Sequence, residues 1–148
     1  MDYEALRDGM DAAIPLNKYL GLKYEEVGPG RGVVTLPDRA ELHNHVASQH
    51  AGGLFAAGEA ASGGAFIGAF AEQMGSITPL AKSASIEYRK IARGPITATG
   101  TMTADPDALV AELEKEGRVE FPIEVEMTDA EGTVVAAMTV QWHVRRNA

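Results

Sequence analysis

The feature that most constrains the fold is a long run of small and apolar residues from His50 to Met74, made largely of Ala, Gly and Phe. Its six glycines would each cost a helix interior roughly 1 kcal/mol relative to alanine, which argues against a helix on propensity alone. The run contains no proline, and its large apolar residues have the spacing of helix faces, namely Leu54, Phe55, Phe66, Ile67 and Phe70. We therefore predict a buried helix, closely approached by neighbouring backbone, in preference to a flexible glycine-rich loop.

The segments on either side of this run predict short helices and strands. Residues Tyr3 to Leu20 begin with a helical pattern whose length Pro15 limits. Asp105 and Gly117 are residue types that cap a helix start and a helix end, which predicts a short helix up to Glu116. Six segments are strand-like: Gly21 to Val27, Gly32 to Leu36, Ser83 to Ile91, Pro95 to Thr103, Arg118 to Thr128 and Thr133 to Arg145. This order predicts one α+β domain over residues 1–148, with an antiparallel sheet of five or six strands wrapped around a long central helix.

Charge and composition narrow the partners and the compartment. The formal net charge of −8 predicts repulsion from nucleic acids and anionic membranes, so neither is an expected partner. The chain has no cysteine, which excludes disulfides, thiolate metal sites and a cysteine nucleophile. Residues Met1 to Asp11 lack the basic and apolar regions of a secretion signal. We expect a cytoplasmic protein that acts on a small molecule.

Glu59 is the one ionisable residue between Ala51 and Ala71. A carboxylate inside an apolar helix loses hydration, which raises its pKa unless hydrogen bonds hold the charge. Such perturbed groups cluster at functional sites, so Glu59 is the first candidate for chemistry. The alternative is a structural glutamate whose helix face meets solvent or a partner chain.

The start of the predicted helix is a second candidate. His50 precedes Ala51, Gly52 and Gly53, whose backbone N–H groups would be among the unpaired donors of the first helical turn. Such donors, together with the helix dipole, stabilise a developing oxyanion. Glu59 lies about 12 Å further along the helix axis, too far to act on the same carbonyl within one chain. A two-fold dimer resolves this, because the helix start of one protomer can face Glu59 of the other.

The spacing of these residues resembles the motif of phenylacetate-pathway-type hotdog-fold thioesterases, in which Asn is followed six residues later by His and then, nine residues on, by an acid. Here these are Asn44, His50 and Glu59. The resemblance implies a dimeric hotdog fold, or a dimer of dimers, that hydrolyses acyl-CoA. It also implies that Glu59 is general base or nucleophile, that the Ala51 amide with Gly52 forms the oxyanion hole, and that Asn44 positions water or the carbonyl. Three departures are Ala51 and Ala47, each in place of Gly, and Glu59 in place of the commoner Asp.

A group of cations suggests how coenzyme A, as part of the substrate, would be held. Lys82, Arg89, Lys90 and Arg93 lie near Tyr88 and could bind its phosphates at the rim of a pocket. The competing interpretation is a solvated strand end and turn. No separate cofactor is expected.

Three alternatives remain at this level. His43, His45 and His50 invite a metal site, but no further ligand pattern accompanies them, so no metal is expected. His45 lies fourteen residues before Glu59, the separation that hotdog hydroxyacyl thioester dehydratases use for their His and acid, although the flanking prolines of those enzymes are missing. A non-catalytic module that binds acyl-CoA would need the pocket but not Glu59. The acyl group cannot be read from the sequence.

Overall fold

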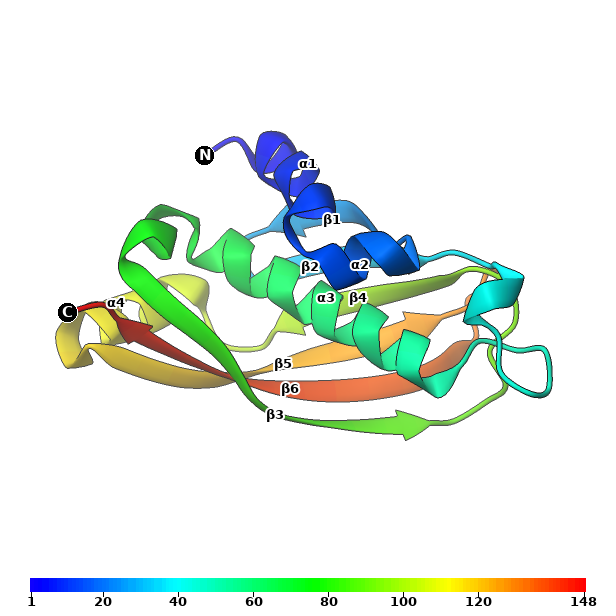
Figure 1. Cartoon of the computed structure of the whole chain (residues 1–148). Coiled ribbons are helices and arrows are strands. Elements are labelled where there is room, and N and C mark those ends of the chain that lie inside the picture. Colours follow the sequence, from blue (N-terminus) through cyan, green and yellow to red (C-terminus); the bar gives the residue numbers. More distant parts are fainter.

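A curved antiparallel sheet of six strands packs around one long helix in the computed structural model, which describes all 148 residues (Figure 1). The helices are α1 (Tyr3–Ala13), α2 (Pro15–Leu20), α3 (Ala51–Ala69) and α4 (Pro106–Glu116). The strands are β1 (Lys23–Gly28), β2 (Arg31–Leu36), β3 (Ile77–Tyr88), β4 (Ile96–Met102), β5 (Arg118–Thr128) and β6 (Val134–Arg146). Short 3-10 turns occupy Ala40–Leu42 and Ala71–Ser76. The predicted α+β class, six-stranded sheet and central helix are confirmed.

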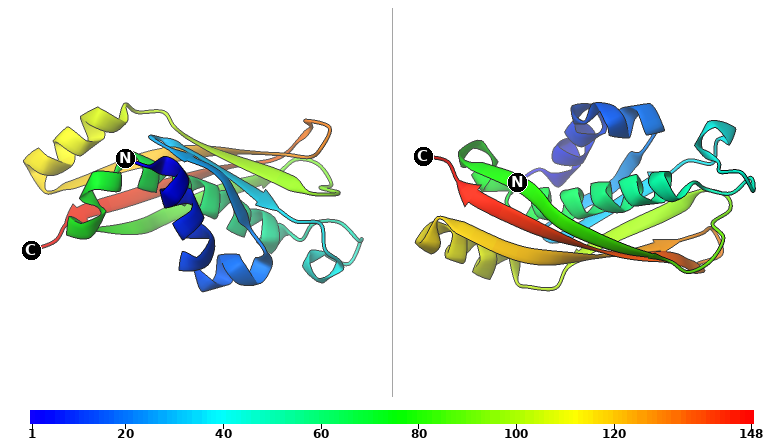
Figure 2. Two further views of the ribbon diagram at one scale, coloured as in Figure 1. Left: turned by 90° about the horizontal axis from the view of Figure 1, so that it is seen from above. Right: turned by 60° about the horizontal axis from the view of Figure 1, so that its bottom comes forward.

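The strand order is β1-β2-β4-β5-β6-β3, so β1 and β3 form the two edges of the sheet. Helix α3 lies across one face, mainly over β1, β2 and β4, and also contacts β5 and β6 (Figures 1 and 2). Helices α1 and α2 lie at the β1 side, whereas the β3 side has no helix over it (Figure 2). No helix combines the length and the hydrophobicity that a membrane crossing needs.

Glycines in α3 let its backbone approach the sheet more closely than any side chain would permit. A Cβ placed on Gly68 would overlap the carbonyl oxygen of Gly28 at the end of β1. A Cβ on Gly58 would come within 2.6 Å of the Met138 sulfur on β6. This close contact offsets the poor helix propensity of glycine, as predicted for a buried helix.

Beneath the second half of α3, four aromatic rings stack on one another within the core. Phe66 stacks on Trp142 at a centroid distance of 5.2 Å and on Phe70 at 5.2 Å, while Phe121 lies 5.5 Å from Phe70. The indole Nε1 of Trp142 donates to the Ser62 hydroxyl at 3.2 Å, which leaves no polar group of this cluster unpaired. The C-terminal half of α3 is therefore fixed in rotation against β5 and β6.

The boundaries differ from the sequence prediction at three places. Pro15 does limit the first helix, but it also begins a second one, since proline is well suited to the first helical position. Helix α3 ends at Ala69, before Met74, and the chain continues as a 3-10 turn. Strand β3 begins at Ile77, six residues earlier than predicted, and includes Pro79, which an edge strand tolerates.

The close approach of α3 to β1 makes a direct prediction. Gly68→Ala should lower the free energy of unfolding by about 1–3 kcal/mol, because the new methyl group must displace backbone and no flexible side chain can move aside. The matched control is Gly9→Ala in α1, where nothing lies within 4 Å of the added Cβ and stability should rise by roughly 0.5–1 kcal/mol. Urea unfolding measures both. Equal effects of the two substitutions would contradict the close-packing account.

Candidate active site

The first turn of α3 presents free backbone donors. His50 is the N-cap, and its Nδ1 accepts the N–H of Gly52 at 2.8 Å. The amides of Ala51 and Gly53 have no acceptor in the chain. Because Nδ1 accepts, the neutral ring carries its proton on Nε2. The Gly52 amide, one of the two amides expected in the oxyanion hole, is thus occupied by His50, and Ala51 and Gly53 retain the available donors.

A cavity of about 370 Å³ adjoins this helix start. Ala51 and Leu54 of α3 form one side of it, and the end of β3 with the following segment forms another. Its lining residues are Asn44, Val46, Ser48, Gln49, Ala51, Leu54, Tyr88, Arg89, Lys90, Ile91 and Ala92. The Tyr88 hydroxyl donates to the Ala51 carbonyl at 3.0 Å and so ties β3 to the first residue of the helix. The cavity combines an apolar lining with donors and cations, as small-molecule sites usually do.

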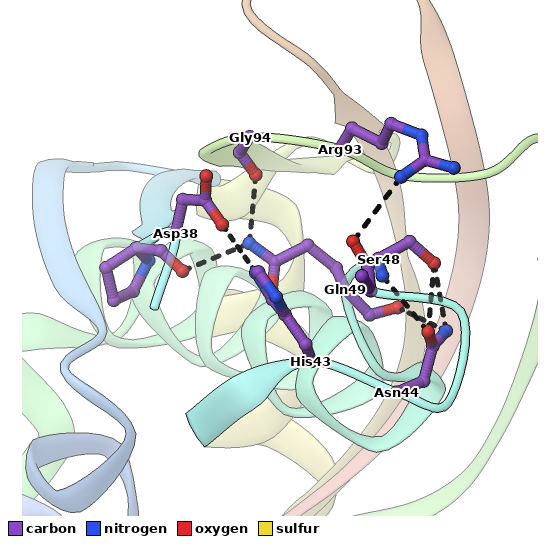
Figure 3. Close-up of polar contacts among 9 residues, drawn as sticks. Asp38, His43, Asn44, Ser48, Gln49, Arg93 and Gly94 are labelled. Atoms are coloured by element: carbon purple, nitrogen blue, oxygen red, sulfur yellow. Dashed lines mark hydrogen bonds and ion pairs between the residues drawn. The ribbon is translucent and has the colours of Figure 1, made fainter. Parts of the chain in front are cut away.

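Asn44 organises the loop that leads into α3 (Figure 3). Its Oδ1 accepts the amides of Val46 and Ser48 at 3.0 and 3.1 Å. Its Nδ2 donates to the Ser48 hydroxyl at 2.9 Å and to the Gln49 carbonyl at 3.4 Å. The tight turn that results contains Ala47 with a φ of 55°, in the left-handed region. Asn44 lines the cavity, and its side chain is engaged within the loop.

Glu59 lies in the middle of α3 and is half-buried. Burial raises the pKa of its carboxyl, and no charged or hydrogen-bonding partner offsets this. The neighbouring Tyr24 hydroxyl is fully buried and donates to the Ala60 carbonyl at 3.2 Å. Burial raises the pKa of Tyr24, and the charge of Glu59 raises it further. Glu59 does not line the cavity beside Ala51, so one protomer does not bring the two predicted groups together.

The four predicted cations separate into two places. Arg89 and Lys90 line the cavity, and Arg93 crosses to the Ala47 carbonyl at 3.4 Å. Lys82 instead pairs with Glu120 at 3.1 Å, away from the cavity. Hydrogen bonds from His143 and from Lys82 lower the pKa of Glu120. Sequence proximity to Tyr88 suggested Lys82, but the register of β3 against β6 directs it elsewhere.

The histidines are dispersed. His45 is exposed at the tip of the Asn44 loop and does not line the cavity. His43 pairs with Asp38 at 2.6 Å, and His143 pairs with Glu120 at 2.9 Å. No three His, Asp or Glu side chains converge as metal ligands would. Each histidine therefore has a separate setting.

Sequence reasoning missed two polar residues of this region. Gln49 is buried and donates to carbonyl oxygens in two distant loops (Figure 3), and Ser48 is buried against Asn44. Both lie in a polar segment that reads as an exposed loop. Only the fold brings their partners to them, so no local pattern could have identified them.

An antiparallel sheet wrapped around a long central helix is the hotdog fold. The family model described as a domain of unknown function, DUF4442, matches residues 3–144, and the chain belongs to this family. Comparison with curated protein sequences found no match.

Solved structures agree on the fold. PA5026 from Pseudomonas aeruginosa, described as a protein of unknown function and probable thioesterase, is 28% identical, with 97% of this chain and 95% of that chain covered and a TM-score of 0.86. AziG of S. sahachiroi is 26% identical over 90% of this chain and 98% of that chain, with a TM-score of 0.72. The E. coli PaaI protein from the phenylacetic acid degradation operon is 19% identical, with 95% of this chain and 90% of that chain covered and a TM-score of 0.72. The last shows similarity of fold alone.

The buried carboxyl predicts a pH-dependent stability difference. Because burial raises the pKa of Glu59 above its value in the unfolded chain, ionised Glu59 destabilises the folded state at pH above the folded pKa. Glu59→Gln should therefore raise the free energy of unfolding at neutral pH, by less than about 1 kcal/mol since water still reaches the carboxylate. The gain should shrink as the pH falls through the raised folded pKa and vanish below the ordinary glutamate pKa of the unfolded chain. Urea unfolding at a series of pH values measures this difference, with the exposed Glu114→Gln as control. A stability gain of Glu59→Gln that grows toward acid pH would contradict the raised pKa of Glu59.

Proposed function

We propose that this protein hydrolyses acyl thioesters of coenzyme A. The observation that carries the proposal is the free Ala51 amide at the start of α3, beside a cavity large enough for part of an acyl thioester. The description of PA5026 as a probable thioesterase, at 28% identity over nearly the whole chain, supports the same class of reaction. The proposal names a substrate class and leaves the acyl group open.

The proposed chemistry uses the helix start as an oxyanion hole. The thioester carbonyl oxygen accepts a hydrogen bond from the Ala51 N–H, and the helix dipole adds partial positive charge at the same place. The Gly53 amide is the second available donor of the turn. The His50 ring holds the Gly52 amide and so keeps the first turn in shape.

Glu59 acts as the general base for water, or as the nucleophile, from the partner subunit. Within one chain it lies about 12 Å along the helix from Ala51, so the two groups need a second protomer to meet. A raised pKa suits a carboxyl that exchanges a proton near neutral pH.

The free edge of β3 is the surface through which we propose that the dimer forms. Strand β3 spans twelve residues, most of them exposed, and no helix covers its inner side. Leu80 and Tyr88 are 52% and 48% exposed, which is unusual for large apolar side chains on a long, regular edge strand. The opposite edge, β1, carries Lys23, Glu25 and Glu26, charges that discourage strand pairing. A dimer of dimers is compatible with the same pairing.

Arg89 and Lys90, with Arg93 close by, are the proposed partners of the coenzyme A phosphates. Their position at the cavity, in a chain of net charge −8, favours a local role for the positive charge. The dehydratase alternative loses support, because His45 is exposed at a loop tip outside the cavity. A binding module without catalysis stays the competing hypothesis.

Glu59→Gln separates catalysis from binding. Free-thiol release against short, medium, long-chain and aryl acyl-CoAs should fall by about 10²–10⁴-fold in the variant, while coenzyme A binding persists. The exposed Glu114→Gln should keep wild-type turnover. Wild-type turnover in Glu59→Gln would remove Glu59 from the mechanism, and binding without turnover in the wild type would favour the binding module.

Ala51→Pro tests the oxyanion donor and the dimer together. Proline at the first helical position removes the amide N–H at little cost to the helix, and the extended backbone of His50 accepts a following proline. Turnover should fall by about 10²–10³-fold.

If each site combines Ala51 of one protomer with Glu59 of the partner subunit, unfolding and refolding an equal mixture of Ala51→Pro and Glu59→Gln should restore about one quarter of wild-type activity, through mixed dimers with one intact site. If the mixture is as inactive as each variant alone, Ala51 of one protomer and Glu59 of the partner subunit do not share an active site.

A further inference from the structure

Gln49 and Ser48 are buried polar residues at the cavity that the proposed hydrolysis does not use, and Gln49 is the one whose side chain reaches other loops. It is 3% exposed and lines the cavity beside Ala51. Buried carboxamides are kept in proteins through their hydrogen bonds, so the partners of Gln49 indicate its role.

The side-chain nitrogen of Gln49 joins two loops that are distant in sequence (Figure 3). Nε2 donates to the Pro37 carbonyl at 3.0 Å, just after β2, and to the Gly94 carbonyl at 2.9 Å, between β3 and β4. Both acceptors are carbonyl oxygens, so only the NH₂ end of the carboxamide fits between them. The main-chain N–H of Gln49 also donates to the Ala92 carbonyl at 2.8 Å.

These bonds hold the far end of the segment from Arg89 to Gly94, which we name the cation segment. At its near end, the amides of Arg89 and Lys90 both donate to the Val135 carbonyl, at 2.8 and 3.1 Å. At its far end, Gln49 supplies the ties at Ala92 and Gly94. The residues between form a wall of the cavity, and Ile91 is 63% exposed there. The Gln49 side chain therefore contributes the tie at Gly94, beside the main-chain bond at Ala92 and the bond from Arg93 to the Ala47 carbonyl.

The carboxamide is not an optimal choice for stability alone. Its Oε1 is buried and has no donor in the chain. A buried acceptor without a partner opposes folding, and an apolar side chain of similar length would avoid that cost. A carboxamide at this position is better explained by what its Nε2 holds in place.

We propose that Gln49 is a positioning residue of the acyl-thioester site. Its carboxamide fixes Gly94 against Pro37 and thereby keeps Arg89 and Lys90 where the phosphates of coenzyme A bind. The role rests on the proposed function, because it concerns the same cavity. Gln49 acts through the cation segment and does not touch the reacting carbonyl.

The test compares Gln49→Met with Gln141→Met. Gln141 lies on β6 opposite Ser83 and Pro122 and does not line the cavity, so it controls for the substitution itself. Amide hydrogen exchange is measured on peptides that cover the cation segment, and KM and kcat on the acyl-CoA that the wild type hydrolyses fastest. In Gln49→Met, exchange in the segment should rise about tenfold and KM about tenfold, with kcat changed less than about threefold. Gln141→Met should change none of these.

Gln49→Glu adds a readout that a merely structural role would not give. An ionised carboxylate cannot donate to the Pro37 or Gly94 carbonyl, whereas a protonated carboxyl can donate to one of them. Burial beside two carbonyl oxygens raises the pKa of the new carboxyl, so the ratio of variant to wild-type KM should fall as the pH is lowered from about 8 to about 6. Gln49→Met should show no such recovery.

Unchanged exchange in the cation segment of Gln49→Met, or a loss confined to kcat, overturns the positioning role in an active enzyme. Failure of the proposed function has a different signature, since the wild type then releases no thiol from any thioester. In that case coenzyme A binding by calorimetry replaces KM. A wild type that does not bind coenzyme A overturns the positioning role together with the proposed function, whatever the exchange shows.

Discussion

Direct contact between the backbone of α3 and the backbone of the sheet is the constraint on which the rest of the structure depends. Gly68 of α3 faces the carbonyl of Gly28 on β1, and Gly32 on β2 faces the carbonyl of Ala61 on α3. With no side chains between them, the sheet must curve around the helix. The helix is then held so closely on its sheet side that its one ionisable residue, Glu59, lies on the less covered side.

The same packing determines where the chemistry can occur. The sheet-facing side of α3 is filled by methionine and aromatic side chains, such as Met138 near Gly58 and Phe66 on Trp142. The helix start extends beyond this core, toward the loop after β2 and the segment after β3, and its amides stay unpaired there. Free donors, cations and a cavity thus meet at one end of the helix, while the carboxylate lies two turns away.

Much of the fold and part of the site could be predicted from the sequence because they depend on local physics. Hydrophobic periodicity, glycine content and helix-capping residues identified α3, α4 and most strands. The isolation of Glu59 among apolar residues predicted the burial that raises its pKa. Lys82 was grouped with the cavity cations because it is near them in the chain, but strand pairing turns it toward Glu120. The early start of β3 was obscured by Pro79, which only its edge position permits.

By itself, the sequence determined which helix is central, most of its apolar faces and which carboxylate is isolated among apolar residues, since hydrophobic periodicity and charge isolation are properties of neighbours along the chain. The tertiary structure decided which polar groups are free and which are occupied. His50 occupies the Gly52 amide, Asn44 closes its own loop, and Gln49 joins segments separated by more than forty residues. These outcomes depend on distances between parts of the chain that no local pattern specifies, and they leave the Ala51 amide available at the cavity.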